Sequence, residues 1–309
     1  MKKLKYLVMA AIAAVVFACG TTRTVPITGR KQNILVSDEQ VLSLSNQEYT
    51  NYMKSAKLST NSANTAMVKR VGQRLATAVE TYLNEHGMAA DVKEYSWEFN
   101  LVQDKSVNAF CMPGGKIVVY EGLLPITQDE ASLAIVLGHE IAHAVAKHSA
   151  EQMSKQIKNQ YGTQILGQVL NAAGVSSSTT QLAQIIAQKG LQFRSLKYSR
   201  DNESEADHMG LIFAAMAGYD PNVAVTFWQR MAQATGSNNQ SDIFSDHPSD
   251  AKRIAAIKQE LPEALTYYKP VKTTTTTKKT TTSTKKKTRT TSKKKTTTSS
   301  KKKTTTRRK

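Results

Sequence analysis

The segment 131–148 constrains this chain most, because it combines a helical pattern with groups that bind metals. At about 3.6 residues per turn, His139 and His143 lie one turn apart on one helix face, so both imidazoles can reach one ion. Glu140 projects from the neighbouring edge, where a carboxylate can act as a general base. This arrangement predicts a catalytic zinc site with one position left for water.

The context of the motif supports a buried helix. Thr127 and Glu130 match a T-x-x-E capping box, which predicts the helix start. An apolar stripe on the opposite face indicates burial against a core, formed by Leu133, Leu137, Ile141 and Val145. His148 is expected at the helix C-terminus and not on the metal. The alternative is a buried helix with two ordinary histidines, because three fixed positions also occur by chance.

Two histidines leave a catalytic zinc one protein ligand short, and residues 199–207 can supply it. We expect a helix from Ser199 to about Ala217, which places Glu203 and Asp207 on one face. One of them can bind the metal while the other hydrogen-bonds a ligand histidine. An acidic first turn favoured by the helix dipole is the alternative for this segment alone.

The middle of the chain predicts an α+β, mainly α-helical fold. Helical periodicity marks 38–57 and 63–85, and alternation marks a strand at 96–102. Two more short β-type runs follow at 106–112 and 116–120, around Pro113-Gly114-Gly115. We expect a small antiparallel sheet packed on the His-Glu-x-x-His helix.

The N-terminus is expected to be a lipoprotein signal peptide, residues 1–18. Three lysines precede an apolar run of thirteen residues, which is too short to span about 30 Å of hydrocarbon. The run ends in a sequence that resembles a bacterial lipobox, which implies cleavage before Cys19 and lipid attachment to it. With Gly20 next, the resemblance implies an exported lipoprotein on the periplasmic face of the outer membrane. An ordinary signal peptide with an incidental cysteine is the alternative.

The other end is a basic tail, residues 272–309, composed only of Lys, Arg, Thr and Ser. It has no apolar residue to bury, so we expect disorder. Subtracting its 16 positive charges from the chain's +18 leaves +2 for the rest. Such a run favours anionic envelope surfaces, with a merely solvated tail as the alternative. Nucleic acid is not expected as a partner, because the chain carries an export signal.

Together the motifs resemble those of zinc metallopeptidases of the HtpX and CAAX prenyl protease type, specifically their soluble, exported BepA-like branch. Their joint order over about 46–261 is more specific than any one motif. The matching motifs are Asn108-Ala109-Phe110 with Pro113-Gly114-Gly115, His139-Glu140-x-x-His143, Glu203-x-x-Ala206-Asp207, and His247-Pro248 with Arg253.

The resemblance implies a zincin-type domain with one Zn²⁺ per chain. The implied ligands are His139, His143 and Glu203, with Glu140 as the catalytic base. Asp207 is then the outer partner of a ligand histidine.

Further residues receive roles in substrate binding and catalysis. His247 or Arg253 is the candidate donor to the oxyanion. His247 could instead occupy the fourth zinc position as a latch, or only pack. The strand around Asn108, Ala109 and Phe110 is a candidate edge to which an extended substrate adds.

We therefore predict a zinc metalloendopeptidase of the bacterial cell envelope that hydrolyses unfolded or misassembled proteins. The expected parts are a signal peptide (1–18), an N-terminal linker (19–45), a metallopeptidase domain (46–271) and the basic tail (272–309). Within the domain, 151–192 is expected to form marginal helices around a loop, with a lid as the alternative. The rival functions are a non-proteolytic chaperone or assembly factor and a surface-binding lipoprotein with a vestigial enzyme.

Overall fold

The computed structural model describes residues 21–171, 193, 196–236 and 251–270. Several predictions concern residues outside these ranges, namely the signal peptide, Cys19, half of the possible lid, His247 and the basic tail. None of the described helices is long and apolar enough to cross a lipid bilayer.

The described chain is mainly helical, with two small sheets, which confirms the expected α+β class. The elements are, in order, β1 (Thr21–Thr24), β2 (Lys31–Ile34), α2 (Asp38–Ser55), α3 (Ser62–Glu85), α4 (Ala89–Val92), β3 (Glu98–Val102), β4 (Ala109–Met112), β5 (Lys116–Tyr120), η1 (Glu121–Leu123), α5 (Leu124–Thr127), α6 (Glu130–Val145), α7 (His148–Asn171), α9 (Arg200–Met216), α10 (Val223–Gly236) and α11 (Ala251–Tyr267).

The three-stranded sheet is mixed, so the expectation of a purely antiparallel sheet is wrong. The strand order is β3-β5-β4, with β5 parallel to β3 and antiparallel to β4. The turn at 113–115 makes a hairpin of β4 and β5, and β5 then lies between β4 and β3. Alternation of apolar residues predicts strands but carries no information about their order.

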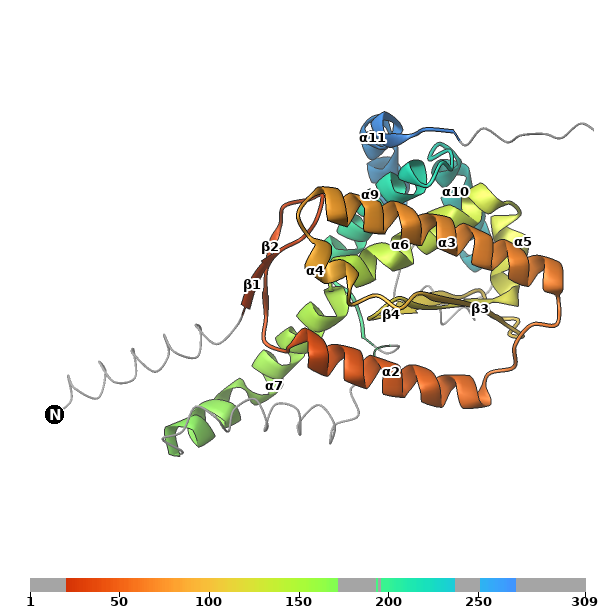
Figure 1. The fold of residues 1–309 in the computed structure, drawn as a ribbon. Coiled ribbons are helices and arrows are strands. Elements are labelled where there is room, and N and C mark those ends of the chain that lie inside the picture. The colour runs from red at the N-terminus through yellow and green to blue at the C-terminus, as the bar shows by residue number, and fades with distance from the viewer. Residues whose placement is uncertain (1–20, 172–192, 194–195, 237–250, 271–309) are drawn as a thin grey trace, which may run out of the picture. The chain divides into compact units, whose positions relative to one another are not determined.

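The alternating side chains of β5 face two different layers of helices. Ile117 and Val119 join the main core with α3 and α6, whereas Val118 and Tyr120 pack in a smaller cluster with Tyr49 of α2. Figure 1 shows α2 on one side of this sheet and α3 with α6 on the other, with α9 beyond α6. Helix α6 therefore lies in the interior, and all but three of its sixteen residues are buried.

Residues 21–45, expected as a linker, contain the β1–β2 hairpin and the first part of α2. Val25 of the hairpin belongs to the main core and is 1% exposed. The expectation of a linker was based on the position of the segment before the motifs, and its short strands have no strong alternating pattern. The folded unit thus begins earlier in the chain than the prediction placed it.

Both ends of α6 differ from the prediction. Asp129, not Thr127, caps the helix, because its side chain accepts a hydrogen bond from the backbone N–H of Ser132. The helix ends at Val145, and Lys147 has a φ of 52° that breaks the chain direction before α7. His148 therefore begins α7 and does not end α6.

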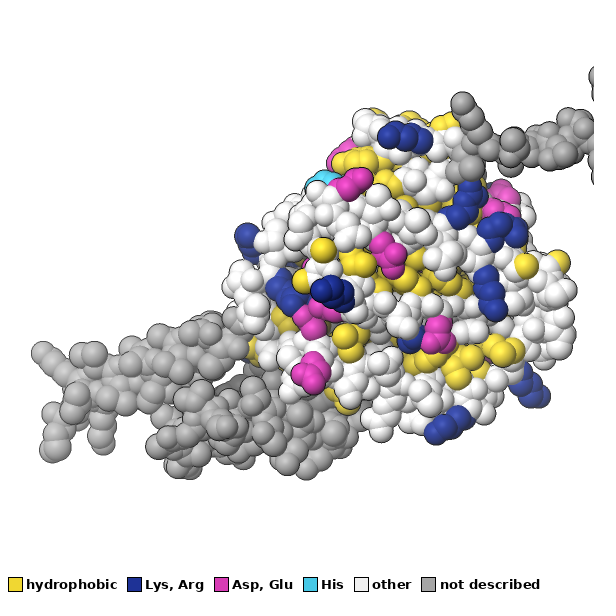
Figure 2. Space-filling view, viewed as in Figure 1, with side chains coloured by type: hydrophobic (Ala, Val, Ile, Leu, Met, Phe, Trp, Pro, Cys, Tyr) yellow, Lys and Arg dark blue, Asp and Glu magenta, His cyan; other side chains and the backbone are white. Residues whose placement is uncertain are grey.

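The described surface carries mixed charge. Figure 2 shows acidic and basic side chains interspersed over the face viewed. This distribution agrees with the small net charge that remains once the basic tail is set aside.

Helices α6 and α9 cross at two glycines with almost no space between their backbones. A Cβ atom on Gly138 of α6 would lie 2.6 Å from the carbonyl oxygen of Gly210 of α9. A Cβ atom on Gly210 would lie 2.7 Å from the backbone nitrogen of His139. Because both obstacles are backbone atoms, only glycine allows this approach.

We predict that Gly210→Ala destabilises the protein by roughly 1–3 kcal/mol, because the added methyl group must push α9 away from α6. In an ordinary helix interior the same change stabilises by about 1 kcal/mol, so the sign of the effect is diagnostic. Urea denaturation of the two proteins measures it. An unchanged or increased free energy of unfolding would contradict the close crossing.

Candidate metal centre

Helix α6 brings the two predicted histidine ligands together in the core. His139 and His143 are 2% and 1% exposed, and their Nε2 atoms are 3.1 Å apart. The rings meet edge to face with centroids 4.7 Å apart. The one-turn spacing predicted from the sequence therefore aims both nitrogens at one point.

Helix α9 supplies the third donor. Ser199 caps this helix at the start that the sequence predicts, and it forms a capping box with Asn202. The next turn places Glu203 beside the histidines, with its Oε2 atom 3.5 Å from His139 Nε2 and its Oε1 atom 3.4 Å from His143 Nε2. His139, His143 and Glu203 thus form a group that can hold a metal ion.

The spacing of these three donors fits zinc. Donors about 2.0–2.1 Å from a tetrahedral zinc are about 3.3–3.4 Å from one another. The two imidazole nitrogens are 3.1 Å apart, and each lies 3.4 or 3.5 Å from one of the two carboxylate oxygens of Glu203, close to that value. Two imidazoles with one carboxylate are also a donor set that zinc prefers at catalytic sites.

Asp207 is the outer partner of His139. Its Oδ1 atom lies 2.9 Å from His139 Nδ1, so the ring donates this proton and turns Nε2 towards the metal position. Burial lowers the pKa of His139, but hydrogen bonds with Asp207 and Glu203 outweigh it and raise the pKa to about 9. A metal ion must therefore compete with a proton for Nε2 of His139.

Arg253 of α11 holds Asp207 in place. Its Nε and Nη2 atoms donate to the Asp207 carboxylate at 2.7 and 2.6 Å, and the guanidinium lies 3.6 Å from the ring centroid of Trp228. Burial raises the pKa of Asp207, but the charge of Arg253 and the hydrogen bond with His139 outweigh it and lower the pKa. Arg253 thus contacts the outer partner of a ligand, and its role as an oxyanion donor stays a prediction.

Glu140 lies on α6 between the two histidines and is 4% exposed. Burial raises the pKa of the Cys111 thiol on β4, and the nearby Glu140 carboxylate adds to this effect. Helix α6 packs against β4, so Glu140 lies near the strand that the sequence predicts for substrate binding.

Strand β4 lies at the edge of its sheet. The N–H of Tyr120 donates to the carbonyl oxygen of Asn108 at 2.9 Å, so these two residues form a hydrogen-bonded pair. Because such pairs alternate along an antiparallel ladder, the backbone groups of Ala109 and Cys111 point away from β5. No described strand pairs with that side of β4. Phe110 packs against Tyr52 of α2 on the far face.

The sequence prediction missed the surroundings of His143. Nδ1 of His148 lies 2.8 Å from Nδ1 of His143, and Nε2 of His148 lies 2.9 Å from Oε2 of Glu205. The ring of Tyr198 stacks on His143 with centroids 4.1 Å apart. The break at Lys147 turns His148 back to the site, and a continuous helix would have carried it away.

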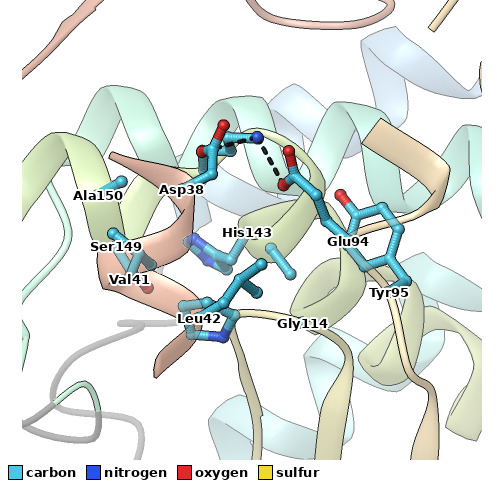
Figure 3. A pocket seen from close by; sticks show the side chains of 12 residues that line it. Asp38, Val41, Leu42, Glu94, Tyr95, Gly114, His143, Ser149 and Ala150 are labelled. Carbon is cyan, nitrogen blue, oxygen red and sulfur yellow. Dashed lines mark hydrogen bonds and ion pairs between the residues drawn. The ribbon is translucent and has the colours of Figure 1, made fainter. Parts of the chain in front are cut away.

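A small cavity adjoins His143 on the side of α2. Figure 3 shows it lined by residues of α2, the 113–115 turn and the α6–α7 junction. Nζ of Lys147 pairs there with Asp38 at 2.9 Å and with Glu94 at 2.7 Å. These ion pairs tie α2 and the segment between α4 and β3 to the end of the ligand helix.

The fold and this donor set define a zinc metallopeptidase, and comparison with known families agrees. Residues 62–261 match peptidase family M48, so the chain belongs to this family. The predicted class and its zinc cofactor are thereby confirmed.

Individual relatives are similar over parts of their length. The chain is 40% identical to the mitochondrial metalloendopeptidase OMA1 of Schizosaccharomyces pombe over 174 residues, which covers 56% of this chain and 49% of the relative. It is 31% identical to the mitochondrial metalloendopeptidase OMA1 of Homo sapiens over 244 residues, which covers 78% of this chain and 46% of the relative. It is 29% identical to the beta-barrel assembly-enhancing protease of Escherichia coli strain K12 over 186 residues, covering 56% and 37%. The chain spans about half the length of the first two relatives.

The relatives correct one prediction. The expected location on the periplasmic face of the bacterial outer membrane is wrong, because the relatives from Schizosaccharomyces pombe, Arabidopsis thaliana and Homo sapiens are mitochondrial and more similar to this chain than those from Escherichia coli. The expectation was based on a four-residue motif ending at Cys19, which is too short to define a compartment.

We predict that Glu203→Ala abolishes zinc binding, whereas Asp207→Asn weakens it by about 10- to 100-fold, the usual effect of losing an outer-shell partner. Asp201→Asn on the exposed side of α9 is the matched control and should bind zinc like wild type. Competition with a chromogenic chelator measures all three affinities. The reverse ranking of Glu203 and Asp207 would mean that their roles are exchanged.

Proposed function

We propose that this chain is a zinc-dependent metalloendopeptidase that hydrolyses peptide bonds in unfolded or misassembled proteins. The observation that carries the proposal is the spacing of the three donors, which suits a tetrahedral ion, beside the buried carboxylate of Glu140. His139, His143 and Glu203 would hold the zinc. They would supply three ligands and leave one position for water or substrate.

Glu140 is the proposed general base. When bound, zinc supplies Lewis acidity towards a carbonyl oxygen and a water molecule. Glu140 accepts a proton from the attacking water and returns it to the leaving amine. Its position on the rigid, buried α6 keeps the carboxylate at a constant distance from both histidines.

Strand β4 is the proposed substrate platform. The outward backbone groups of Ala109 and Cys111 can pair with an extended peptide, which would lie along the edge near Glu140. Main-chain pairing of this kind needs several residues without secondary structure of their own. It therefore favours unfolded or loop segments over compact folds, and cleavage within a chain over removal of its terminal residue.

Some finer expectations stay predictions. Membership of the BepA-like branch, acylation of Cys19 and a part for His247 at the metal are not needed for the chemistry described. The rival function, a binding protein whose zinc is structural, is disfavoured by Glu140, because a structural site does not need a buried carboxylate beside its ligands.

We predict that Glu140→Gln keeps zinc but lowers the rate of casein hydrolysis by at least about 100-fold, since the base is removed and the ligands are not. Glu130→Gln, at the start of the same helix, is the control and should retain both properties. Zinc content by mass spectrometry and release of labelled peptides measure the two. Turnover close to wild type would rule out Glu140 as the base, and loss of zinc would make it a ligand.

We also propose that the basic tail, residues 272–309, binds anionic surfaces. Its removal should weaken cosedimentation with phosphatidylglycerol vesicles, and the difference should fade as salt is raised, because the attraction is electrostatic. Hydrolysis of a soluble peptide and the melting temperature should not change, because the tail has no apolar residue to bury. A chain whose tail basic residues are all glutamine should behave like the deletion. Unchanged vesicle binding, or a melting temperature lower by several degrees, would contradict this prediction.

A further inference from the structure

The two ligand histidines are held by different outer partners. His139 donates to a carboxylate, Asp207, directly. From its Nδ1 atom, His143 reaches a carboxylate through a second imidazole, because His148 lies between it and Glu205. The question is which groups hold this longer hydrogen-bonded path in place.

The direction of each hydrogen bond between His143 and Glu205 follows from the position of the other metal donors. Nε2 of His143 faces the other donors, so its proton resides on Nδ1 and is donated to Nδ1 of His148. A neutral imidazole that accepts at Nδ1 carries its own proton on Nε2, and His148 donates this proton to Glu205. The tautomers of both histidines thus depend on a carboxylate that stays in place as an acceptor.

The β1–β2 hairpin holds that carboxylate. Nε of Arg30 donates to Oε2 of Glu205 at 2.8 Å, and the hydroxyl of Thr28 donates to Oε1 at 2.5 Å. The outer edge of the Arg30 guanidinium, formed by Nη1 and Nη2, donates two hydrogen bonds to Glu151 of α7, at 3.1 and 2.8 Å. Arg30 is therefore fixed by two carboxylates, each 6% exposed.

The charge state of the carboxylates agrees with this geometry. Burial raises the pKa of Glu205, but hydrogen bonds from His148, Arg30 and Thr28 outweigh it and lower the pKa to about 2. Burial likewise raises the pKa of Glu151, but the bonds from Arg30 and Lys155 lower it to about 2. Both carboxylates are thus matched by the same guanidinium.

The hairpin itself is anchored at the site. Val25 is buried in the main core, and the side-chain amide of Gln32 donates to the carbonyl oxygen of Ala146, the C-cap residue of α6, at 3.0 Å. Ile27 has a φ of 66°, which a β-branched residue adopts only when its surroundings impose it. Yet the hairpin lies outside residues 62–261, the part that matches the peptidase family.

We propose that the β1–β2 hairpin is a working part of the metal centre, in which Arg30 and Thr28 position Glu205 and, through His148, fix the tautomer and direction of the ligand His143. Arg30 is a positioning residue and does not touch the metal or the substrate. This inference rests on the proposed function, because it takes His143 as a zinc ligand.

The test compares Arg30→Ala with Arg23→Ala in the full chain. Arg23 is the matched control, since it lies on the same hairpin, binds two carboxylates, Asp38 and Asp91, and has the same 31% side-chain exposure. Zinc affinity is measured by chelator competition, and the melting temperature is measured after zinc is stripped.

We expect Arg30→Ala to weaken zinc binding by about tenfold, at the low end of effects from outer-shell partners because it acts through two residues. Arg23→Ala should change the affinity less than twofold, although both variants remove ion pairs of the hairpin. Equal effects of the two variants on zinc affinity would overturn the proposal, because the hairpin would then act only on stability. An unchanged zinc affinity in both variants would also overturn the proposal.

A second comparison covers the case in which Arg30→Ala does not fold. Thr28→Val removes one hydrogen bond to Glu205 without a change of charge, and it should weaken zinc binding measurably while the zinc-free melting temperature stays within about a degree. In a double-mutant cycle, Thr28→Val should add little to the loss of zinc affinity caused by His148→Asn, since both act through the same hydrogen-bonded path. Full additivity would contradict the proposal. Failure of wild-type protein itself to bind zinc would instead refute the proposed function.

Discussion

The close crossing of α6 and α9 at Gly138 and Gly210 is the constraint on which the rest of the site depends. Zinc needs donors about 3.3–3.4 Å apart, and the close crossing brings side chains of two separate helices to about that spacing. One helix carries both histidines and the base, and the other carries Glu203 and Asp207. The sheet and α3 hold α6 from the opposite side, so the crossing cannot open without disturbing the core.

Burying several carboxylates and imidazoles in one core is costly unless each charge is matched and hydrogen-bonded. The protein solves this with one arginine behind each of the two ligand histidines. Arg253 compensates Asp207 behind His139, and Arg30 compensates Glu205 behind His143 and His148. The two arginines come from opposite ends of the described chain. Both ends are therefore tied to the metal centre, although neither supplies a ligand.

The metal donors and their helices were predictable because they follow local rules. The spacing of His139 and His143, the Ser199 cap and the acidic residues after it are each set by helix periodicity and capping within a few residues. The contacts of His148, Glu205 and Arg30 were not predictable, because they depend on a backbone break at Lys147 and on a hairpin distant in sequence. The parallel pairing of β3 with β5 was missed for the same reason, since strand order is a property of the whole fold.

Anomalous diffraction at the zinc absorption edge, on crystals of the zinc-loaded protein, tests the central claim most directly. The claim is that one zinc is held by two helices through three side chains. The expected result is a single ion with the Nε2 atoms of His139 and His143 at about 2.0–2.1 Å and a carboxylate oxygen of Glu203 at about 2.0–2.2 Å, with Glu140 outside the coordination sphere. An ion bound elsewhere, or one coordinated by Glu140 in place of Glu203, would contradict it.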